Sequence, residues 1–268
     1  MTTEKAGKIY IGIGGWTFEP WEGSFYPDKL PAKRQLEYAS GKLTSIEVNG
    51  TYYSSQKPET FQKWHDETPD GFVFSLKASR FSTNRKVLAE AGESIDRFFA
   101  SGVARLGAKL GPINWQFMAT KKFDPADFEA FLKLLPKSID GLTLRHVVEV
   151  RSDSFRTPEF ADLVHKHGVA AVISADGEFP QIADPTASFI YARILGTTED
   201  EPLGYSPAAL DKWAERAKVW AAGGRPDGLD YAGGGDQTKQ PRDVYLYVIS
   251  GFKQRNPHAA MALIERLQ

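Results

Sequence analysis

Short apolar runs rich in β-branched residues alternate with amphipathic stretches along the whole chain. Each run has the length of a strand, and each stretch carries apolar residues at helical spacing. Alternation of this kind predicts a parallel sheet covered by helices. Eight runs are predicted to be strands: Ile9–Gly14, Thr44–Asn49, Phe72–Lys77, Pro112–Phe117, Arg145–Arg151, Val169–Ala175, Phe189–Leu195 and Val244–Ser250.

Five of the amphipathic stretches carry a proline near their first turn, where its missing N–H costs nothing. The predicted helices are Pro58–Glu67, Pro125–Leu135, Pro158–His167, Pro207–Ala222 and Pro257–Leu267. Polar residues just before four of these helices are predicted to accept hydrogen bonds from their first turn, as N-caps do. These predicted caps are Asp124, Thr157, Ser206 and Asn256.

Eight strands with helices between them suit a closed barrel better than an open sheet. The 268 residues also match the roughly 250 that a (β/α)8 barrel, or TIM barrel, usually needs. The chain is therefore predicted to be one α/β domain over residues 1–268, a single TIM barrel with eight parallel strands. Residues 223–242, rich in Gly, Asp, Gln and Pro, are predicted to form a long surface loop.

Composition narrows the range of functions. Hydrophobic residues make up 41% of the chain and charged residues 25%, which is typical of a globular protein. The absence of cysteine excludes disulfides, thiolate zinc sites and cysteine nucleophiles. The net charge of −1 lacks the basic excess of most nucleic-acid-binding proteins. Because no secretory signal and no membrane-length apolar run is visible, we expect a cytoplasmic protein without a membrane partner. The oligomeric state stays open.

Side chains alternate inward and outward along a strand, and active sites of TIM barrels lie where the strands end. Apolar residues that should face the outer helices therefore indicate which polar residues point inward near the strand ends. This polar layer is predicted to contain Glu47, Asn49, Lys77, Gln116, Glu149, Arg151, Asp176 and Arg193. Tyr191, Tyr245 and Tyr247 have the same inward parity, whereas His146 is predicted to face outward.

Two interpretations of this polar layer stay open. Its carboxylates and cations could neutralise one another as a structural ion-pair network. Alternatively they form a functional site, because buried charges are costly unless they are paired and aromatic residues surround these. The aromatic residues, which lie in or near predicted loops and could wall a ligand pocket, are Trp16, Trp21, Tyr26, Tyr52, Tyr53 and Trp115.

Lys77 is the predicted reactive group, because a lysine at a strand end can form a Schiff base or bind an anion. Its alternative role is an ion pair with Glu47 or Glu149. These two glutamates are also the candidates for general acid and base, so the predicted catalytic set is Lys77, Glu149 and Glu47. The predicted substrate-binding residues are Trp16, Asn49, Tyr52, Tyr53, Gln116, Arg151, Asp176, Tyr191 and Arg193, with the arginines holding a carboxylate or phosphate.

Other familiar sites find little support in the sequence. The five histidines do not suggest a converging metal site, and we expect neither a metal nor a cofactor. No GxSxG elbow and no P-loop occurs. The run Gly12-Ile13-Gly14-Gly15 has the wrong spacing for a dinucleotide fingerprint and is predicted to form a tight turn. Gly196-Thr197 lies where barrels often bind phosphate.

Several short motifs follow one another over nearly the whole chain. They include Gly14-Gly15-Trp16, Glu47-Val48-Asn49, Thr51-Tyr52-Tyr53, Lys77-Ala78, Val148-Glu149-Val150-Arg151, Ser174-Ala175-Asp176 with Phe179-Pro180, and Tyr191-Ala192-Arg193. This series resembles the YecE-like family, known as domain of unknown function 72. The resemblance implies a TIM barrel with a site at these positions and no established activity. The chain departs from the family at Thr83-Asn84 and Leu195-Gly196, where the family commonly has histidines.

Two hypotheses about function remain. The first is a metal-independent hydrolase, lyase or isomerase that acts on a small anionic substrate, such as a sugar phosphate or a phosphodiester. The alternative is a non-catalytic protein that binds a ligand or single-stranded nucleic acid with its aromatic and basic rim. Lys77, Arg80, Arg85 and Lys86 would form a basic loop around Phe81, and basic grooves with stacking rings hold single strands. The net charge near zero argues against this alternative.

Overall fold

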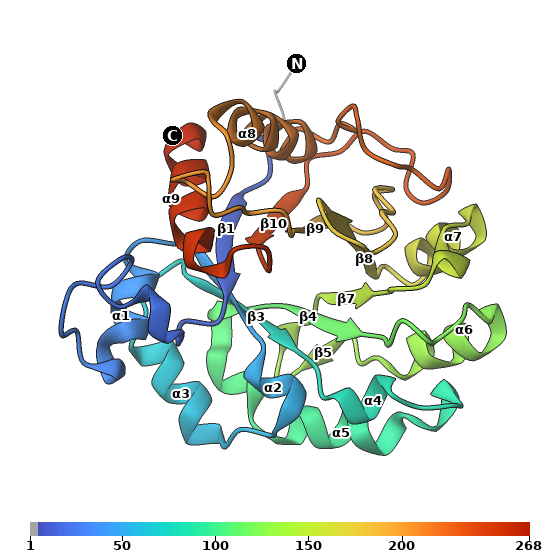
Figure 1. The fold of residues 1–268 in the computed structure, drawn as a ribbon. Coiled ribbons are helices and arrows are strands. Elements are labelled where there is room, and N and C mark those ends of the chain that lie inside the picture. The colour runs from blue at the N-terminus through green and yellow to red at the C-terminus, as the bar shows by residue number, and fades with distance from the viewer. Residues whose placement is uncertain (1–4) are drawn as a thin grey trace.

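A computed structural model describes residues 5–268 of the chain. Eight parallel strands close into a barrel in the order β1-β10-β9-β8-β7-β4-β3-β2, and helices enclose it (Figure 1). All eight predicted strands are present, so the predicted (β/α)8 barrel is confirmed. The strands are β1 (Ile9–Gly14), β2 (Ser45–Val48), β3 (Val73–Lys77), β4 (Leu110–Gln116), β7 (His146–Glu149), β8 (Ala170–Ala175), β9 (Phe189–Ile194) and β10 (Asp243–Val248).

The helices lie outside the strands, and the five predicted from the sequence are all present. They are α3 (Pro58–Asp66), α6 (Pro125–Leu134), α7 (Pro158–Lys166), α8 (Pro207–Ala221) and α9 (Asn256–Leu267). The sequence pattern missed four further helices, none of which begins with a proline. These are α1 (Gln35–Ser40), α2 (Gly50–Tyr53), α4 (Arg80–Thr83) and α5 (Gly92–Ala100). It also missed a small antiparallel pair, β5 (Ser138–Ile139) and β6 (Leu142–Thr143).

Three of the four predicted helix caps are confirmed. The side chains of Asp124, Thr157 and Ser206 each accept a backbone N–H from the first turn of the helix that follows. The prediction for Asn256 is wrong, because α9 begins at Asn256 itself and Arg255 occupies the cap position. The Asn256 amide oxygen instead accepts a hydrogen bond of 2.7 Å from the Thr197 hydroxyl.

No helix connects β8 to β9, and residues 223–242 lie against this connection instead (Figure 1). The backbone N–H of Ala183 donates to the carbonyl of Asp230 at 2.8 Å, and the Asp184 carboxylate accepts the N–H of Ala232 at 2.6 Å. A buried ion pair of 2.7 Å between Asp236 and Arg242 lies inside the segment. The predicted loop thus has no helix or strand of its own, but it is tied to the barrel.

Inward and outward parity along the strands is as predicted where the strands are regular. Val73, Val147 and Val172 belong to the small apolar cluster inside the barrel, together with Tyr191, Tyr245 and Tyr247. His146 faces outward, where it accepts a hydrogen bond of 3.1 Å from the Trp115 indole. Within residues 5–268, no helix is both long enough and apolar enough to cross a membrane.

Candidate functional site

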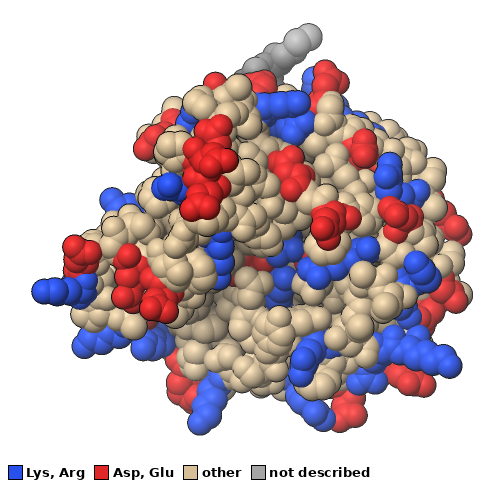
Figure 2. Space-filling view, in the orientation of Figure 1, with Lys and Arg blue, Asp and Glu red and all other residues tan. Residues whose placement is uncertain are grey.

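Five charged side chains meet inside the barrel near the ends of its strands, and we call Glu47, Lys77, Glu149, Arg151 and Arg193 the charge cluster. Glu149 accepts hydrogen bonds of 2.6 Å from Arg151 and 2.7 Å from Arg193 through the same carboxylate oxygen. Arg193 also reaches Glu47 at 3.2 Å. Figure 2 shows basic and acidic atoms at the bottom of a hollow in the middle of the molecule.

Strand register explains why these side chains converge. Glu47 on β2 lies beside Gly14 on β1, and Gln116 on β4 lies beside Glu149 on β7. Arg193 on β9 lies beside Ser174 on β8. All these positions face inward near the C-terminal ends of their strands. The closed barrel therefore brings residues that are far apart in sequence into one layer.

Tyrosine and serine hydroxyls form the floor of the charge cluster. Tyr191 donates a hydrogen bond of 2.6 Å to Glu47 and lies 2.8 Å from the Ser75 hydroxyl. Tyr247 lies 2.8 Å from the Ser45 hydroxyl in the same layer. Both tyrosines are fully buried, and burial is the main reason why their pKa values are well above the usual range. Both therefore stay protonated, and Tyr191 holds the Glu47 carboxylate above it.

Lys77 occupies the centre of the charge cluster. Its Nζ donates a hydrogen bond of 2.5 Å to the amide oxygen of Gln116 and lies 3.9 Å from Glu47 and 3.8 Å from Glu149. Burial and the neighbouring Arg193 lower the pKa of Lys77, although both carboxylates oppose this change. The ammonium is thus easier to deprotonate than a lysine in water.

Glu149 is the most strongly bound carboxylate of the site. Burial alone would raise the pKa of Glu149, but Arg193, Lys77 and Arg151 outweigh it and lower the pKa to about 2. A further hydrogen bond of 3.0 Å comes from the buried amide of Asn114. Sequence reasoning missed Asn114, although it stands two residues before Gln116 and so shares its inward parity.

Arg151 is the most exposed cation of the charge cluster. Its side chain keeps 23% of its surface accessible, against 0% for Glu149. The guanidinium stacks on the ring of Phe179, 4.3 Å from the ring centroid. Stacking of this kind holds a guanidinium in place without neutralising its charge. Phe179 is not among the predicted site residues, because its position in the loop after β8 gave no sign of this contact.

A cavity of about 360 Å³ opens at the ends of β1 and β2, and we call it the rim pocket. Its polar and aromatic walls come from Trp16, Asn49, Gln56, Trp64 and Lys253. Trp16, predicted as a wall residue, lines this pocket, and Asn49, predicted to belong to the polar layer, lines it too and does not contact the charge cluster. A Cβ atom on Gly14 would lie 2.9 Å from the Asn49 amide, so glycine makes room for that side chain.

Lys253 is a second functional candidate that sequence reasoning missed. Its ammonium lies 4.2 Å from the centroid of the Phe18 ring and 5.4 Å from that of Trp21. Burial lowers the pKa of Lys253. Within residues 5–268, no carboxylate lies within 4.0 Å of its Nζ. The lysine follows β10 in a polar stretch that gave no signal of a pocket.

Three of the predicted aromatic wall residues are instead buried away from any pocket. Trp115 points outward from β4 and packs against the helices, because it has the opposite parity to Gln116. Trp21 and Tyr26 are buried within the segment after β1, where they pack against each other. Tyr52 is nearly buried, whereas Tyr53 is 65% exposed, and the two rings contact edge to face.

Three further predicted positions do not join the charge cluster. Asp176 has a φ of 59°, which turns its carboxylate toward α8, where it accepts a hydrogen bond of 3.1 Å from Trp213. Tyr191 lies beneath Glu47 and is closed off from solvent. Thr197 is buried and binds Asn256, so Gly196-Thr197 is not free to bind phosphate.

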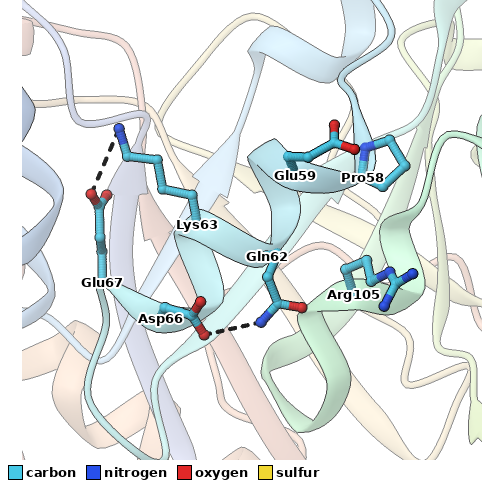
Figure 3. A pocket seen from close by; sticks show the side chains of 7 residues that line it. All are labelled: Pro58, Glu59, Gln62, Lys63, Asp66, Glu67 and Arg105. Carbon is cyan, nitrogen blue, oxygen red and sulfur yellow. Dashed lines mark hydrogen bonds and ion pairs between the residues drawn. The ribbon is translucent and has the colours of Figure 1, made fainter.

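A larger cavity, of about 550 Å³, lies along the outside of α3 and the turn Val103–Lys109. Figure 3 shows that its polar side chains pair with one another, Lys63 with Glu67 and Gln62 with Asp66. Such a solvated groove on an outer helix lies away from the strand ends. In the described part of the chain, no three His, Asp or Glu side chains are grouped so that they could hold a metal ion.

Comparisons with known proteins place the chain among proteins without an assigned function. UPF0759 protein YecE of Escherichia coli (strain K12) is 28% identical over 142 residues, which are 52% of this chain and 48% of YecE. UPF0759 protein YunF of Bacillus subtilis (strain 168) is 32% identical over 78 residues, 29% of this chain and 27% of YunF. The aligned segments thus span about half or less of these curated relatives.

A solved structure has the same fold over its whole length. The crystal structure of a DUF72 family protein from Thermotoga maritima superimposes with a TM-score of 0.72 at 22% identity. The match covers 97% of this chain and 99% of that one. A family model described as a protein of unknown function, DUF72, matches residues 10–268. Because that match covers nearly the whole chain, the protein belongs to the DUF72 family.

Proposed function

We propose that the protein is an enzyme that acts on a small phosphorylated or carboxylated substrate at the ends of the barrel strands. The observation that carries this proposal is the charge balance of the charge cluster. With Lys77 protonated, three cations face two carboxylates. A buried excess charge is costly, and a bound anion removes the excess. An anion is therefore the ligand that this layer favours.

Lys77 is the proposed reactive group. Its lowered pKa increases the share of neutral amine, which can take a proton from a substrate or add to a carbonyl carbon. Arg151 is the cation that a substrate reaches first, and its planar fork suits a carboxylate or a phosphate. Gln116 orients the amine through its amide oxygen. The proposed chemistry uses these side chains alone.

The two glutamates have a positioning role in this proposal. Glu149 stays ionised at neutral pH, because its pKa of about 2 leaves no proton to donate. Glu47 is fully buried and holds Arg193 and Tyr191. The general acid or base role predicted for these residues stays a prediction, and the hydrogen bonds they accept favour holding the cations in place.

The rim pocket supplies a place for the uncharged body of the substrate. Gly14 on β1 lies beside Glu47 on β2, so the rim pocket borders the charge cluster. The Trp16 ring offers a packing surface, and the amides of Asn49 and Gln56 suit hydroxyl groups. A short polyhydroxy compound with one anionic end, such as a sugar phosphate or a sugar acid, matches both parts.

Thermal unfolding in the presence of anions tests the binding part of the proposal. We expect phosphate, glucose 6-phosphate or gluconate to raise the melting temperature in a saturable way. Lys77→Met and Arg151→Gln should abolish the shift. Arg156→Gln is the matched control, because Arg156 lies on the same loop at the surface, paired with Asp230 at 3.7 Å. If no anion stabilises the protein, or if both site variants respond as the wild type does, the proposal fails.

Turnover separates an enzyme from a binding protein. Each anion that binds is incubated with the protein and followed by NMR, and we expect conversion that Lys77→Met abolishes. Treatment with borohydride and a carbonyl substrate should add mass at Lys77 if the amine forms a Schiff base. If several anions bind tightly but none is converted, the proposal of catalysis is wrong. The proposal of an anion-binding site would then remain.

A further inference from the structure

Charge is unevenly distributed around the mouth of the barrel. The segments after β2, β3 and β4, residues 49–57, 78–87 and 117–124, contain six basic residues and one acidic residue. The segments after β8 and β9, residues 176–188 and 195–206, contain six acidic residues and no basic one. The two sets lie on opposite sides of the closed barrel, because β3 and β9 are four strands apart in it.

The first three segments, which we call the basic sector, present cations that mostly lack a carboxylate partner within residues 5–268. Its cations are Lys57, Arg80, Arg85, Lys86, Lys121 and Lys122. Among residues 5–268, only Lys121 of these six pairs with a carboxylate, that of Asp127 at 2.8 Å. The acidic residue, Asp124, is occupied as the cap of α6. A net charge near zero for the whole chain therefore conceals a strongly basic face.

Exposed apolar side chains gather in the same sector. Five large hydrophobic residues are exposed in the described part of the chain, and four of them lie in the basic sector: Tyr53, Phe81, Val87 and Met118. Phe81 is 61% exposed, and the Arg80 guanidinium lies 5.4 Å from its ring and 5.9 Å from that of Tyr53. Two rings are thus offered to solvent beside one arginine.

A depression of about 430 Å³ continues this surface. It is lined by Arg85, Lys86, Lys121 and Lys122, with Met118 among them. Its lining residues all come from the segments that follow β3 and β4. This lining suits a flexible polymer that carries one negative charge on each of its repeating units.

We propose that the basic sector binds single-stranded nucleic acid. Unpaired cations in a groove match a phosphate backbone, and exposed rings match unstacked bases, which is how single strands are held without sequence preference. A double helix hides its bases and would leave both rings unused. This proposal does not rest on the proposed enzyme function, since the six cations and two rings it uses belong neither to the charge cluster nor to the rim pocket.

Fluorescence anisotropy with labelled oligo-dT and oligo-U of about 20 nucleotides tests this proposal. We expect the full-length protein to bind both, with an affinity that falls steeply as salt increases. Each ring should contribute about 5- to 150-fold in affinity, so a Tyr53→Ala, Phe81→Ala double variant should bind at least about 30-fold more weakly. Lys86→Gln and Lys122→Gln should each reduce the slope of log affinity against log salt by about 0.7.

Matched controls separate the basic sector from other surfaces. Lys137→Gln and Leu203→Ala change an exposed lysine and an exposed apolar residue outside the sector and should leave binding unchanged. Arg151→Gln should also retain it, although it abolishes any response to small anions. Loss of oligonucleotide binding in Arg151→Gln would move the contact to the charge cluster and overturn the assignment.

Other polyanions decide whether bases are recognised at all. We expect heparin and duplex DNA to compete weakly on a per-charge basis, and vesicles with phosphatidylserine not to retain the protein. If heparin or such vesicles bind as well as oligo-dT, or if the aromatic double variant binds as the wild type does, the surface recognises charge alone. Either result would refute binding of single-stranded nucleic acid through this sector.

Discussion

Replacement of Glu149 by Gln removes one negative charge from the charge cluster while keeping shape and most hydrogen-bonding atoms. In the variant, three cations face Glu47 as the one remaining carboxylate. Positions 47 and 149 are both fully buried, so water cannot replace the lost charge. We expect the Glu149→Gln protein to lose about 3–5 kcal/mol of unfolding free energy, the range typical of breaking a buried ion pair. The same change should leave the barrel topology intact.

The magnitude follows from the distances. Glu149 lies 2.6 Å from Arg151, 2.7 Å from Arg193 and 3.8 Å from Lys77. At an effective dielectric constant of about 20, each pair is worth about 4–6 kcal/mol. Removal of the carboxylate from water offsets several kcal/mol of this attraction. The pKa of about 2, against an ordinary 4.5, corresponds to a net stabilisation of about 3 kcal/mol at neutral pH.

Lys77→Met tests the same reasoning in the opposite direction. The ammonium gains about 4 kcal/mol from each carboxylate, but burial and Arg193 outweigh this gain and lower the pKa of Lys77. Its removal leaves two cations facing two carboxylates. We therefore expect Lys77→Met to change the unfolding free energy by no more than about 1 kcal/mol, or to stabilise the protein.

Urea unfolding followed by circular dichroism measures both variants under the same conditions. The double variant Glu149→Gln, Lys77→Met should lose less stability than the sum of the single changes, because one excess cation is gone. A Lys77→Met protein that is destabilised as much as Glu149→Gln would refute the charge-balance argument. Additive losses of unfolding free energy in the double variant would refute the argument as well.

The pH dependence of the two variants has the same sign but falls in different pH windows, because both pKa values are lowered by folding. Between the lowered pKa of Lys77 and its ordinary 10.5, the unfolded chain binds more protons than the folded one, so stability gained at Lys77 rises with pH. Any advantage of Lys77→Met over the wild type should thus be greatest below that window and shrink toward its upper end. The contribution of Glu149 is fully present above pH 4.5 and is lost as the pH falls toward 2.

Three further predictions concern other parts of the structure. Burial lowers the pKa of His146 to about 4, so its NMR titration should have a midpoint near pH 4. The stability that this neutral histidine contributes should fall as the pH drops from 6.5 to 4. Phe179→Ala should weaken anion binding a few-fold by calorimetry, since Arg151 loses its stacking partner. Asp236→Ala leaves Arg242 buried without its carboxylate, so unfolding free energy should fall by about 3–5 kcal/mol, and proteases should cut within residues 223–241.

The inner layer of the barrel could be predicted from the sequence because the pleat has a fixed period of two. Once apolar Phe74 and Leu76 are assigned to the outer helices, Lys77 must point inward. The same rule places Glu149 and Arg193 correctly, and applied consistently it also predicts Asn114. Register between strands then follows from closure of the barrel, which leaves little freedom for residues within a strand.

The rule stops where the strands stop, and this explains the positions that it missed. Asp176 has the inward parity of β8, but it stands one residue beyond the strand end, and its positive φ redirects the side chain to Trp213. Lys253 and Phe179 lie in loops whose course no local pattern specifies. What the sequence of a loop still indicates is its net charge, since like charges act over about 8–10 Å at physiological salt, whatever the exact course of the loop. In this barrel, strand geometry therefore determines which side chains form the buried charge cluster. The basic sector follows instead from composition, because its loops contain many basic residues and almost no acidic ones.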